Sequence, residues 1–262
     1  MKLSVDQALA RAKRLARNGE VLEAEKLFGE IVNAYPKNLR ARQALAALRG
    51  SGSSAVPSLS PEVGAKIANL AKLYHQGRLK ELSEQARPLV DQHPRAIPLW
   101  MLLGASYIGQ GLSERALACF RSVLKIEPRH AEAHNNLGAA FQALGDLDSA
   151  IESYSRAVDL KPDHGEAHFN LGNTLARKRE YAEAITSFGR SLSFKPDYAE
   201  AHNNLGSALK EVGELDKAVE SYRRALEYKS DYADAHNNLG NAFKATGELA
   251  LSIEHYRCAL KG

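Results

Sequence analysis

The chain has 262 residues, of which 44% are hydrophobic and 25% are charged, and its formal net charge is +4. These proportions are typical of a folded protein and exclude a disordered or collagen-like chain. No apolar run reaches the roughly 18 residues of a membrane-spanning helix. Two cysteines are too few for a disulfide framework or a four-cysteine zinc site, so we expect a reduced, cytoplasmic protein.

Residues 1–49 are predicted to form an N-terminal piece of three helices. Apolar side chains recur at helical spacing in residues 5–31, and a further helical segment covers 39–48. The start of the chain is rich in Arg and Lys and lacks the apolar stretch of a secretory signal peptide. The first 50 residues contain ten Lys or Arg and five Asp or Glu. A solvated helix surface explains this charge better than nucleic acid or anionic lipid, because no aromatic-plus-basic motif accompanies it.

Residues 50–61 are predicted to be a linker. Gly, Ser and Pro make up most of this segment, which runs from Gly50 to Pro61. Such a composition is typical of a flexible connection or a long loop. We therefore expect the N-terminal piece to be separate from a main array at 62–262.

A period of 34 residues runs through the main array. The string His-Asn-Asn-Leu-Gly begins at His134, His202 and His236, and His-Phe-Asn-Leu-Gly begins at His168. We number the positions of each repeat from the third residue before this histidine. Five full repeats then begin at residues 63, 97, 131, 165 and 199, and an incomplete repeat begins at 233.

Each repeat is predicted to be an antiparallel pair of helices. Positions 4, 7, 8 and 11 form the stripe of one amphipathic helix, and positions 20, 24 and 27 form a second stripe. A Gly at position 15 is expected to end the first helix. Arg179 replaces this Gly in one repeat, which predicts a looser turn there. Because a single pair cannot bury its own apolar face, the pairs should stack into an all-α solenoid.

The recurring aromatic, Leu-Gly, Ala and Pro positions resemble the tetratricopeptide repeat (TPR). The resemblance covers nearly the whole chain except about 39–62. It implies a right-handed TPR superhelix, an α-solenoid of antiparallel helix pairs, with 1–49 as a TPR-like N-terminal piece. It also implies that the first helices of the repeats line a concave groove that binds a protein or an extended peptide.

The candidate binding residues lie at positions that helix packing leaves unexplained. Positions 2, 6, 9 and 13 point away from the apolar stripe of the first helix. The candidates at positions 6, 9 and 13 are mostly carboxamides: Asn136, Asn170, Asn204 and Asn238, then Asn173 and Asn241, then Arg177. Asn is a mediocre helix former. Its recurrence at position 6 therefore reflects either a function or the copying of a duplicated repeat, and the sequence favours neither.

The Asn-Leu-Gly signature most resembles the superhelical repeats of O-linked N-acetylglucosamine transferases. This resemblance implies that the position-6 asparagines form a ladder that grips the backbone of an extended peptide. A carboxamide suits this role because it supplies a hydrogen-bond donor and an acceptor together, as a peptide unit requires. The repeat at residue 97 has Leu102 at position 6, so the ladder is expected to begin at Asn136.

Acidic side chains at position 2 have a local explanation. Asp163, Asp197 and Asp231 each precede a position-2 acid by three residues. This spacing resembles an N-terminal capping box. We therefore expect these acids to cap the first helices and not to bind a ligand.

Nothing in the sequence predicts an active site. Two histidine pairs have the four-residue spacing that can hold zinc on a helix: His130 with His134, and His164 with His168. Tyr198 and Tyr232 replace the first histidine in later repeats, which argues for packing. We therefore predict no metal and no cofactor. Cys119 and Cys258 read as ordinary helix residues, and no nucleophile or phosphate-binding motif is present. The chain is predicted not to be an enzyme.

The sequence thus predicts an interaction scaffold that binds a partner peptide or protein in the concave groove of 97–262. Two alternatives stay open. Similar TPR arrays precede glycosyltransferase or sulfotransferase domains in bacterial proteins, so the chain could be the N-terminal recognition arm of a larger enzyme. The chain could also be a homo-oligomer, associating through the half-repeat at 39–49 or through its last repeat, which lacks a polar cap.

Overall fold

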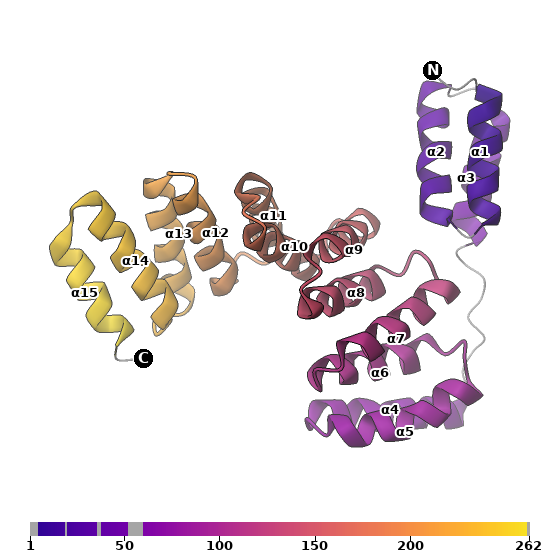
Figure 1. Cartoon of the computed structure of the whole chain (residues 1–262), viewed down its shortest axis with the longest axis horizontal. Coiled ribbons are helices and arrows are strands. Elements are labelled where there is room, and N and C mark those ends of the chain that lie inside the picture. The colour runs from indigo at the N-terminus through magenta and orange to yellow at the C-terminus, as the bar shows by residue number, and fades with distance from the viewer. Residues whose placement is uncertain (1–4, 19, 36–37, 52–59, 261–262) are drawn as a thin grey trace. The chain divides into compact units, whose positions relative to one another are not determined.

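The computed structural model describes residues 5–18, 20–35, 38–51 and 60–260, and every regular element in these ranges is an α-helix (Figure 1). The residues divide into two compact units, Met1–His130 and Ala131–Gly262. The helices of the first unit are α1 (Val5–Arg17), α2 (Val21–Ala34), α3 (Leu39–Ser51), α4 (Pro61–His75), α5 (Leu79–Gln92), α6 (Ile97–Gly109) and α7 (Ser113–Ile126). The helices of the second unit are α8 (Ala131–Leu144), α9 (Leu147–Leu160), α10 (Gly165–Arg177), α11 (Tyr181–Phe194), α12 (Ala199–Glu211), α13 (Leu215–Tyr228), α14 (Ala233–Thr246) and α15 (Leu249–Ala259).

The predicted all-α solenoid of antiparallel helix pairs is confirmed. In the second unit each repeat forms one pair, from α8 with α9 to α14 with α15 (Figure 1). Each pair also packs on the next, because α9 contacts α10, α11 contacts α12 and α13 contacts α14. The apolar core is therefore distributed along the stack and is not gathered at one centre.

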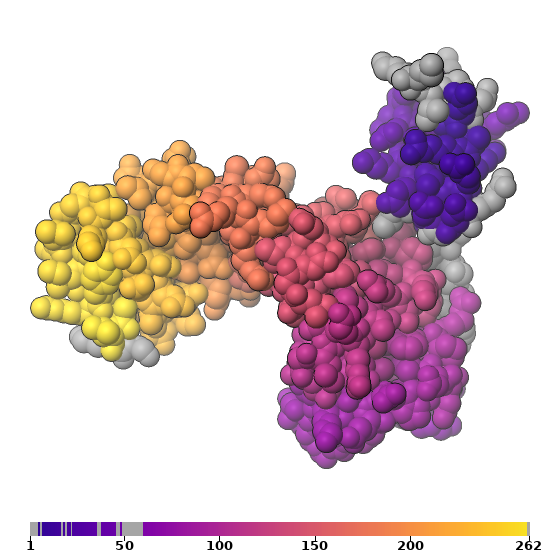
Figure 2. Space-filling view, viewed as in Figure 1, coloured from indigo at the N-terminus to yellow at the C-terminus, as the bar shows by residue number. Residues whose placement is uncertain are grey.

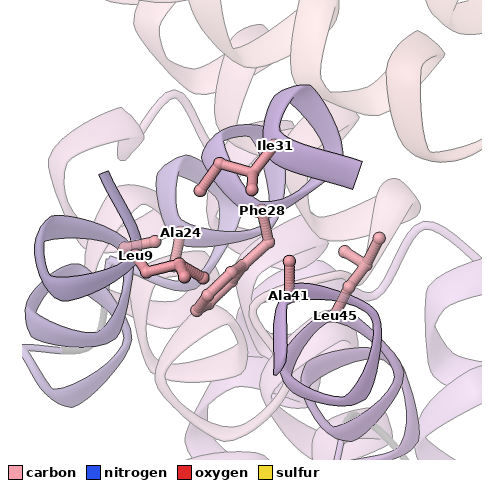
Figure 3. Packing of buried hydrophobic residues seen from close by; sticks show 7 residues of the cluster. Leu9, Ala24, Phe28, Ile31, Ala41 and Leu45 are labelled. Atoms are coloured by element: carbon pink, nitrogen blue, oxygen red, sulfur yellow. The ribbon is translucent and has the colours of Figure 1, made fainter. Parts of the chain in front are cut away.

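Helices α1 to α3 enclose a small core of their own. Phe28 of α2 is almost fully buried and lies between Leu9 of α1 and Ala41 of α3 (Figure 3). The alanines at these contacts let the helices approach closely, and the long apolar residues fill the space between them. Three helical segments thus suffice to bury one aromatic ring.

The boundary between α3 and α4 falls within the predicted linker. Helix α3 continues to Ser51 and α4 begins at Pro61, while 52–59 lie outside the described residues. The start of α4 is specified locally. Ser60 is its N-cap and accepts a hydrogen bond from the Val63 amide at 3.4 Å, and Pro61 occupies the first turn, where its missing N–H is not needed.

The two helices of a pair meet where a glycine faces an aromatic ring. Position 8 is Gly and position 24 is Tyr or Phe in each repeat of the second unit. A Cβ atom added to Gly206 would lie 2.7 Å from the ring of Tyr222, and one added to Gly172 would lie 2.8 Å from the ring of Phe188. Both rings are fully buried. The glycine is therefore required by close approach of the helices and not by its backbone conformation.

The turn at Arg179 corrects one expectation. Glycines occupy position 15 in the neighbouring repeats and adopt left-handed conformations, with φ of 82° at Gly145 and 84° at Gly213. Arg179 adopts the same conformation, with φ of 65°. The Glu180 amide donates to the carbonyl of Leu175 at 3.0 Å, as the Glu214 amide does to Leu209 at 2.9 Å in the next repeat. The expected looser turn is wrong, because surrounding hydrogen bonds impose the glycine geometry on arginine.

The expected capping boxes are also wrong. The N-caps of α10, α12 and α14 are His164, Tyr198 and Tyr232, and none of these three caps has a side-chain hydrogen bond to its helix. The preceding Asp therefore lies one residue too early to cap. Two position-2 acids instead reach the end of the second helix of their own repeat: Glu132 lies 3.3 Å from Lys161, and Glu200 lies 3.8 Å from Lys229.

The first helices form the inner row of the second unit. Helix α8 contacts α10, α10 contacts α12 and α12 contacts α14. Within the described residues, α9 and α11, like α11 and α13, approach each other less closely than these first helices do. A stack whose first helices lie closer together than its second helices curves toward the first helices. We call their surface, formed by positions 6, 9 and 13, the inner face.

Candidate functional site

Three of the four position-6 asparagines bind across repeat boundaries, and Asn136 accepts a hydrogen bond from Asn135 of its own repeat. All four are half-buried, on α8, α10, α12 and α14. The Asn170 side-chain amide donates to Asn135 Oδ1 at 3.1 Å, and the Asn238 amide donates to Asn203 Oδ1 at 3.0 Å. Each bond joins one first helix to the first helix before it. The predicted column therefore contains two groups of hydrogen-bonded carboxamides on one face, one over α8 and α10 and one over α10, α12 and α14.

Asn204 follows the same rule with a different partner. The preceding repeat carries Phe169 at position 5, where the other repeats of the second unit carry Asn. Asn204 instead donates to Oδ1 of Asn173, at position 9, at 2.8 Å. The side chain of Phe169 packs on the ring of Tyr198, with centroids 4.5 Å apart. One substitution at position 5 thus moves the inter-repeat bond from position 5 to position 9.

Sequence reasoning missed the position-5 asparagines as members of this network. Asn135 and Asn203 are only 2% and 5% exposed. Asn135 donates to Asn136 Oδ1 at 3.5 Å, and Asn203 donates to Asn204 Oδ1 at 3.1 Å. The repeated Asn-Asn doublet was a visible signal. The sequence alone does not show that the first Asn of the doublet points into the repeat interface.

The network leaves hydrogen-bonding capacity on the inner face. A carboxamide has two N–H donors and two acceptor lone pairs. The side chains of Asn170 and Asn238 each use one N–H within the described residues, and their Oδ1 atoms accept no hydrogen bond there. Asn204 uses one N–H and one lone pair. Each of these side chains can therefore still donate to and accept from a peptide unit.

A groove of about 400 Å³ lies between α10, α11 and α12. It contains three predicted residues and six others: Asn173, Arg177 and Asn204, with Ala176, Tyr181, Phe188, Ser207, Ala208 and Glu211. Of the predicted residues, the structure therefore brings together one charged side chain and two carboxamides from neighbouring repeats. Tyr181 was not predicted, because nothing in the period shows which second-helix residues reach the inner face. Glu211 is at position 13 of the first helix α12, a position expected to face away from the apolar stripe, but it was not among the candidate binding residues.

The remaining predicted residues lie outside this groove. Asn136, Asn170 and Asn238 belong to the carboxamide network. Asn241 belongs to a separate contact, because its Oδ1 accepts a hydrogen bond from the hydroxyl of Tyr256 at 2.7 Å. In the preceding repeat, Ser207 at the same position accepts from the Tyr222 hydroxyl at 3.3 Å. Position 9 is thus partly a structural partner of the position-24 tyrosine.

Two opposite charges line the groove with little compensation. Arg177 is exposed, and no ion pair of the described residues includes it. Glu211 has the ammonium of Lys210 3.7 Å away, and both of these side chains are substantially exposed. Exposed pairs at such a distance contribute little free energy. Both charges are therefore available to a ligand.

The position-4 side chains have a structural role. The His168 Nε2–H donates to the carbonyl of Pro162 at 3.0 Å, and the His202 Nε2–H donates to the carbonyl of Pro196 at 2.9 Å. Trp100 makes the equivalent bond through its indole N–H. A flat ring with an N–H donor satisfies the position. Within the described residues, no group of three or more His, Cys, Asp or Glu is placed to hold a metal ion.

His164 and Cys119 also have structural surroundings. His164 is buried and lies 3.2 Å from a carboxylate oxygen of Glu132. Burial alone would raise the pKa of Glu132, but His164 and Lys161 outweigh this effect and hold it below its usual value. Burial raises the pKa of the Cys119 thiol to about 12, which suppresses the reactive thiolate. None of the described helices combines the length and apolarity needed to cross a membrane.

Models of one repeat family match the chain in sequence. A model described as "Tetratricopeptide repeat" matches residues 101–164 and 138–199, and one described as "TPR repeat" matches 206–247. Together these matches cover more than half of the chain. No curated protein sequence matches it.

Solved structures match the fold. MamA is 28% identical to this chain, with a TM-score of 0.58, and the alignment covers 61% of this chain and 93% of MamA. A chain of the Cut9–Hcn1 hetero-tetramer of the APC/C is 18% identical, with a TM-score of 0.66. The alignment covers 98% of this chain and 52% of that one. YrrB, described as a TPR protein with an unusual peptide-binding site, is 19% identical, with a TM-score of 0.59 and coverage of 68% and 92%. The last two similarities are evidence of the fold alone.

Proposed function

Since the chain belongs to the tetratricopeptide repeat proteins, we propose that its second unit binds an extended peptide segment of a partner protein along the inner face. The position-6 asparagines contact the peptide backbone, and the groove beside Arg177 takes its side chains. The whole chain then acts as an interaction scaffold. The finding that YrrB has a peptide-binding site is consistent with this use of the fold.

The observation that carries the proposal is the open capacity of the carboxamide network. These asparagines link the first helices on the inner face, and these links use only part of the hydrogen-bonding capacity of each side chain. The side chains of Asn170, Asn204 and Asn238 each donate one N–H to the preceding repeat and keep at least one N–H and one acceptor lone pair free of other hydrogen bonds in the described residues. A row of preorganised carboxamides matches the alternating N–H and C=O groups of an extended chain.

The test compares ladder and control variants with a selected peptide. Peptides that bind the full chain are first selected from a random-sequence library, and their Kd values are measured by fluorescence anisotropy. The variant Asn170→Ala/Asn204→Ala/Asn238→Ala is expected to lose more than about tenfold in affinity, since each lost hydrogen bond contributes roughly 0.5–1.5 kcal/mol. Circular dichroism checks that the variant keeps its helices.

Asn237→Ala is the matched control. Asn237 precedes Asn238 on α14 and occupies position 5 of the last repeat. Its side chain is exposed. The Asn237→Ala variant should bind the selected peptide with an affinity within about twofold of that of the unchanged chain, which is the usual effect of a surface substitution. Equal affinity of the folded triple variant and the unchanged chain would refute the ladder.

A second candidate function is self-association through α14 and α15. Leu249, Ile253 and Leu260 are 60%, 52% and 88% exposed, and this helix pair forms an outer surface of the second unit (Figure 2). Asn237 is exposed, whereas the equivalent Asn203 is buried under the next repeat. We propose that a helix from a second copy covers this surface.

Analytical ultracentrifugation tests the second candidate. The unchanged chain should associate as its concentration rises, and Leu249→Glu/Ile253→Glu should remain monomeric with its helix content intact. An unchanged chain that stays monomeric across a wide concentration range excludes self-association through this surface. That outcome would leave the proposal of peptide binding along the inner face unchanged.

A further inference from the structure

Position 13 distinguishes the middle of the second unit from its ends. Its residues are Ala143, Arg177, Glu211 and Ala245 in the four repeats. Duplication copies a residue from repeat to repeat, so the position-6 asparagines alone give the face no variation along its length. Position 13 carries charge only at the two central repeats, and both charged side chains line the same groove.

The α10 side of the groove is rich in unused donors. Asn204 donates to the carbonyl oxygen of Asn173, which leaves both N–H groups of the Asn173 amide without a hydrogen bond in the described residues. The guanidinium of Arg177 adds five further donors and a positive charge. A ligand group that satisfies several donors and neutralises a cation is a carboxylate, which only accepts hydrogen bonds when ionised.

The α12 side of the groove has the opposite character. Ser207 donates to the carbonyl of Asn203 and accepts from Tyr222, so its hydroxyl proton is already used. Glu211 then provides an acceptor with a negative charge, and Lys210 at 3.7 Å compensates it only weakly. A lysine or arginine side chain of a ligand is the complement of this end.

The spacing of the two charges fits one extended segment. Packed helix axes lie about 8–10 Å apart, so Arg177 and Glu211 on α10 and α12 are separated by about one helix spacing. An extended chain advances about 3.3 Å per residue, and side chains two residues apart point to the same side about 7 Å from each other. Flexible side chains cover the small remaining difference.

From these observations we propose that the groove selects a peptide in which an acidic and a basic residue are separated by one residue. The acidic side chain binds Arg177 with Asn173, and the basic side chain binds Glu211. This inference rests on the proposed function, because the asparagines hold the backbone of the same peptide. It adds a specificity that the backbone contacts cannot supply.

The experiment uses four synthetic peptides of equal length in a Ser/Thr/Gly background. One contains Asp-x-Lys, one contains Lys-x-Asp, one contains Asp-x-Asp and one contains Ser-x-Ser. Binding to the full chain is measured by fluorescence anisotropy. One of the two mixed-charge orders should bind about threefold to tenfold more tightly than Ser-x-Ser. Asp-x-Asp should lose this advantage because its second carboxylate meets Glu211.

The charge-swap variant Arg177→Glu/Glu211→Arg makes the test specific. Both side chains are exposed, so the swap leaves the core intact. The variant should prefer the mixed-charge order that the unchanged chain binds less well. Arg190→Glu and Glu220→Arg, at exposed sites on the second helices α11 and α13, make the same changes of charge away from the groove and should leave the preference unaltered.

The outcomes separate this inference from the proposed function. If the peptides bind with equal affinity, or if the swap does not exchange the preferred order, the charge selection is wrong and backbone binding stands. If none of the four peptides binds and the library yields no binder, the proposed function itself fails and the inference fails with it.

Discussion

At the scale of single residues, the inner face is held together by side-chain amides that bind one another. Asn204 shows this most clearly, because it donates to Asn173 and accepts from Asn203, which is buried. A side chain that links two repeats and also faces a ligand contributes to stability and to binding together. These two contributions have to be measured separately.

Asn204→Ala is expected to lower the free energy of unfolding by about 1–2 kcal/mol. The substitution leaves the buried amide of Asn203 and the carbonyl of Asn173 without their partners, and an unsatisfied buried polar group costs about that much. Urea denaturation followed by circular dichroism measures the change. Asn237→Ala, at an exposed site, should stay within about 0.5 kcal/mol of the unchanged chain. Equal stability of the two variants would mean that the network contributes nothing.

Arg179→Gly is expected to stabilise the chain by up to about 1 kcal/mol. A non-glycine residue in the left-handed region costs roughly 1–2 kcal/mol, and part of the gain from glycine is offset by its greater freedom in the unfolded chain. The reverse change, Gly213→Arg, places the same strain in the next repeat and should destabilise it. A thermal midpoint that falls with Arg179→Gly would contradict this account of the turn.

The last repeat is expected to lose stability in mild acid because of His255. The Nε2–H of His236 donates to the carbonyl of Ser230 at 3.1 Å, so its Nδ1 accepts from the Nδ1–H of His255 at 2.9 Å. Burial, and then the neighbouring imidazole of His236, hold the pKa of His255 below its usual value. A depressed histidine pKa means that protons bind the unfolded chain more tightly. The contribution of His255 to the free energy of unfolding is therefore complete above about pH 6.5. It is lost as the pH falls toward the pKa of His255 in the folded chain.

His255→Ser provides the control for this pH effect. Serine occupies the same position in the three preceding repeats as Ser153, Ser187 and Ser221. Urea denaturation of both proteins between about pH 7.5 and about pH 5.5 should show a larger loss of stability for the unchanged chain. Parallel pH profiles would show that His255 does not couple folding to pH.

At the scale of helices, the contact between a glycine and an aromatic ring sets the distance within each pair. Gly206→Ala is expected to destabilise the chain by about 1–3 kcal/mol, because its Cβ would overlap the buried ring of Tyr222. Gly189→Ala is the matched control. Gly189 is exposed in α11 with nothing within 4 Å of an added Cβ, so alanine there should stabilise the helix by about 1 kcal/mol. Chemical denaturation that gave both changes the same sign would contradict the packing argument.

The sequence was sufficient for the helix pairs but not for contacts between them. The period, the apolar stripes and the glycine at position 8 predicted each pair, because these signals depend only on spacing along one helix. The partner of Asn170 was not predictable, because it is set by which side chain of the preceding repeat lies across the interface. The misplaced caps have a similar cause, since Asp163 precedes the helix by one residue more than capping allows.

At the scale of the whole molecule, the second unit is a stack in which each repeat contacts its neighbours. Such an array has nearest-neighbour stability and a long surface and lacks a central pocket. An extended peptide can therefore meet one carboxamide per repeat over α8 to α14. The groove between α10 and α12 is the place where this regular surface becomes distinctive. Backbone contacts supply most of the affinity in this account, and the two charges supply the choice of sequence.

The most direct measurement of the central claim compares a library-selected peptide with the same peptide carrying N-methylated backbone amides. Calorimetric titration against the full chain should show an affinity loss of more than about tenfold on methylation, because the Asn170, Asn204 and Asn238 carbonyl oxygens would lose the backbone N–H groups they accept from. Replacing those side chains of the peptide that lie outside the groove by alanine should change its affinity little. Unchanged affinity after methylation, with binding lost on alanine replacement, would show that the asparagines do not hold the peptide backbone.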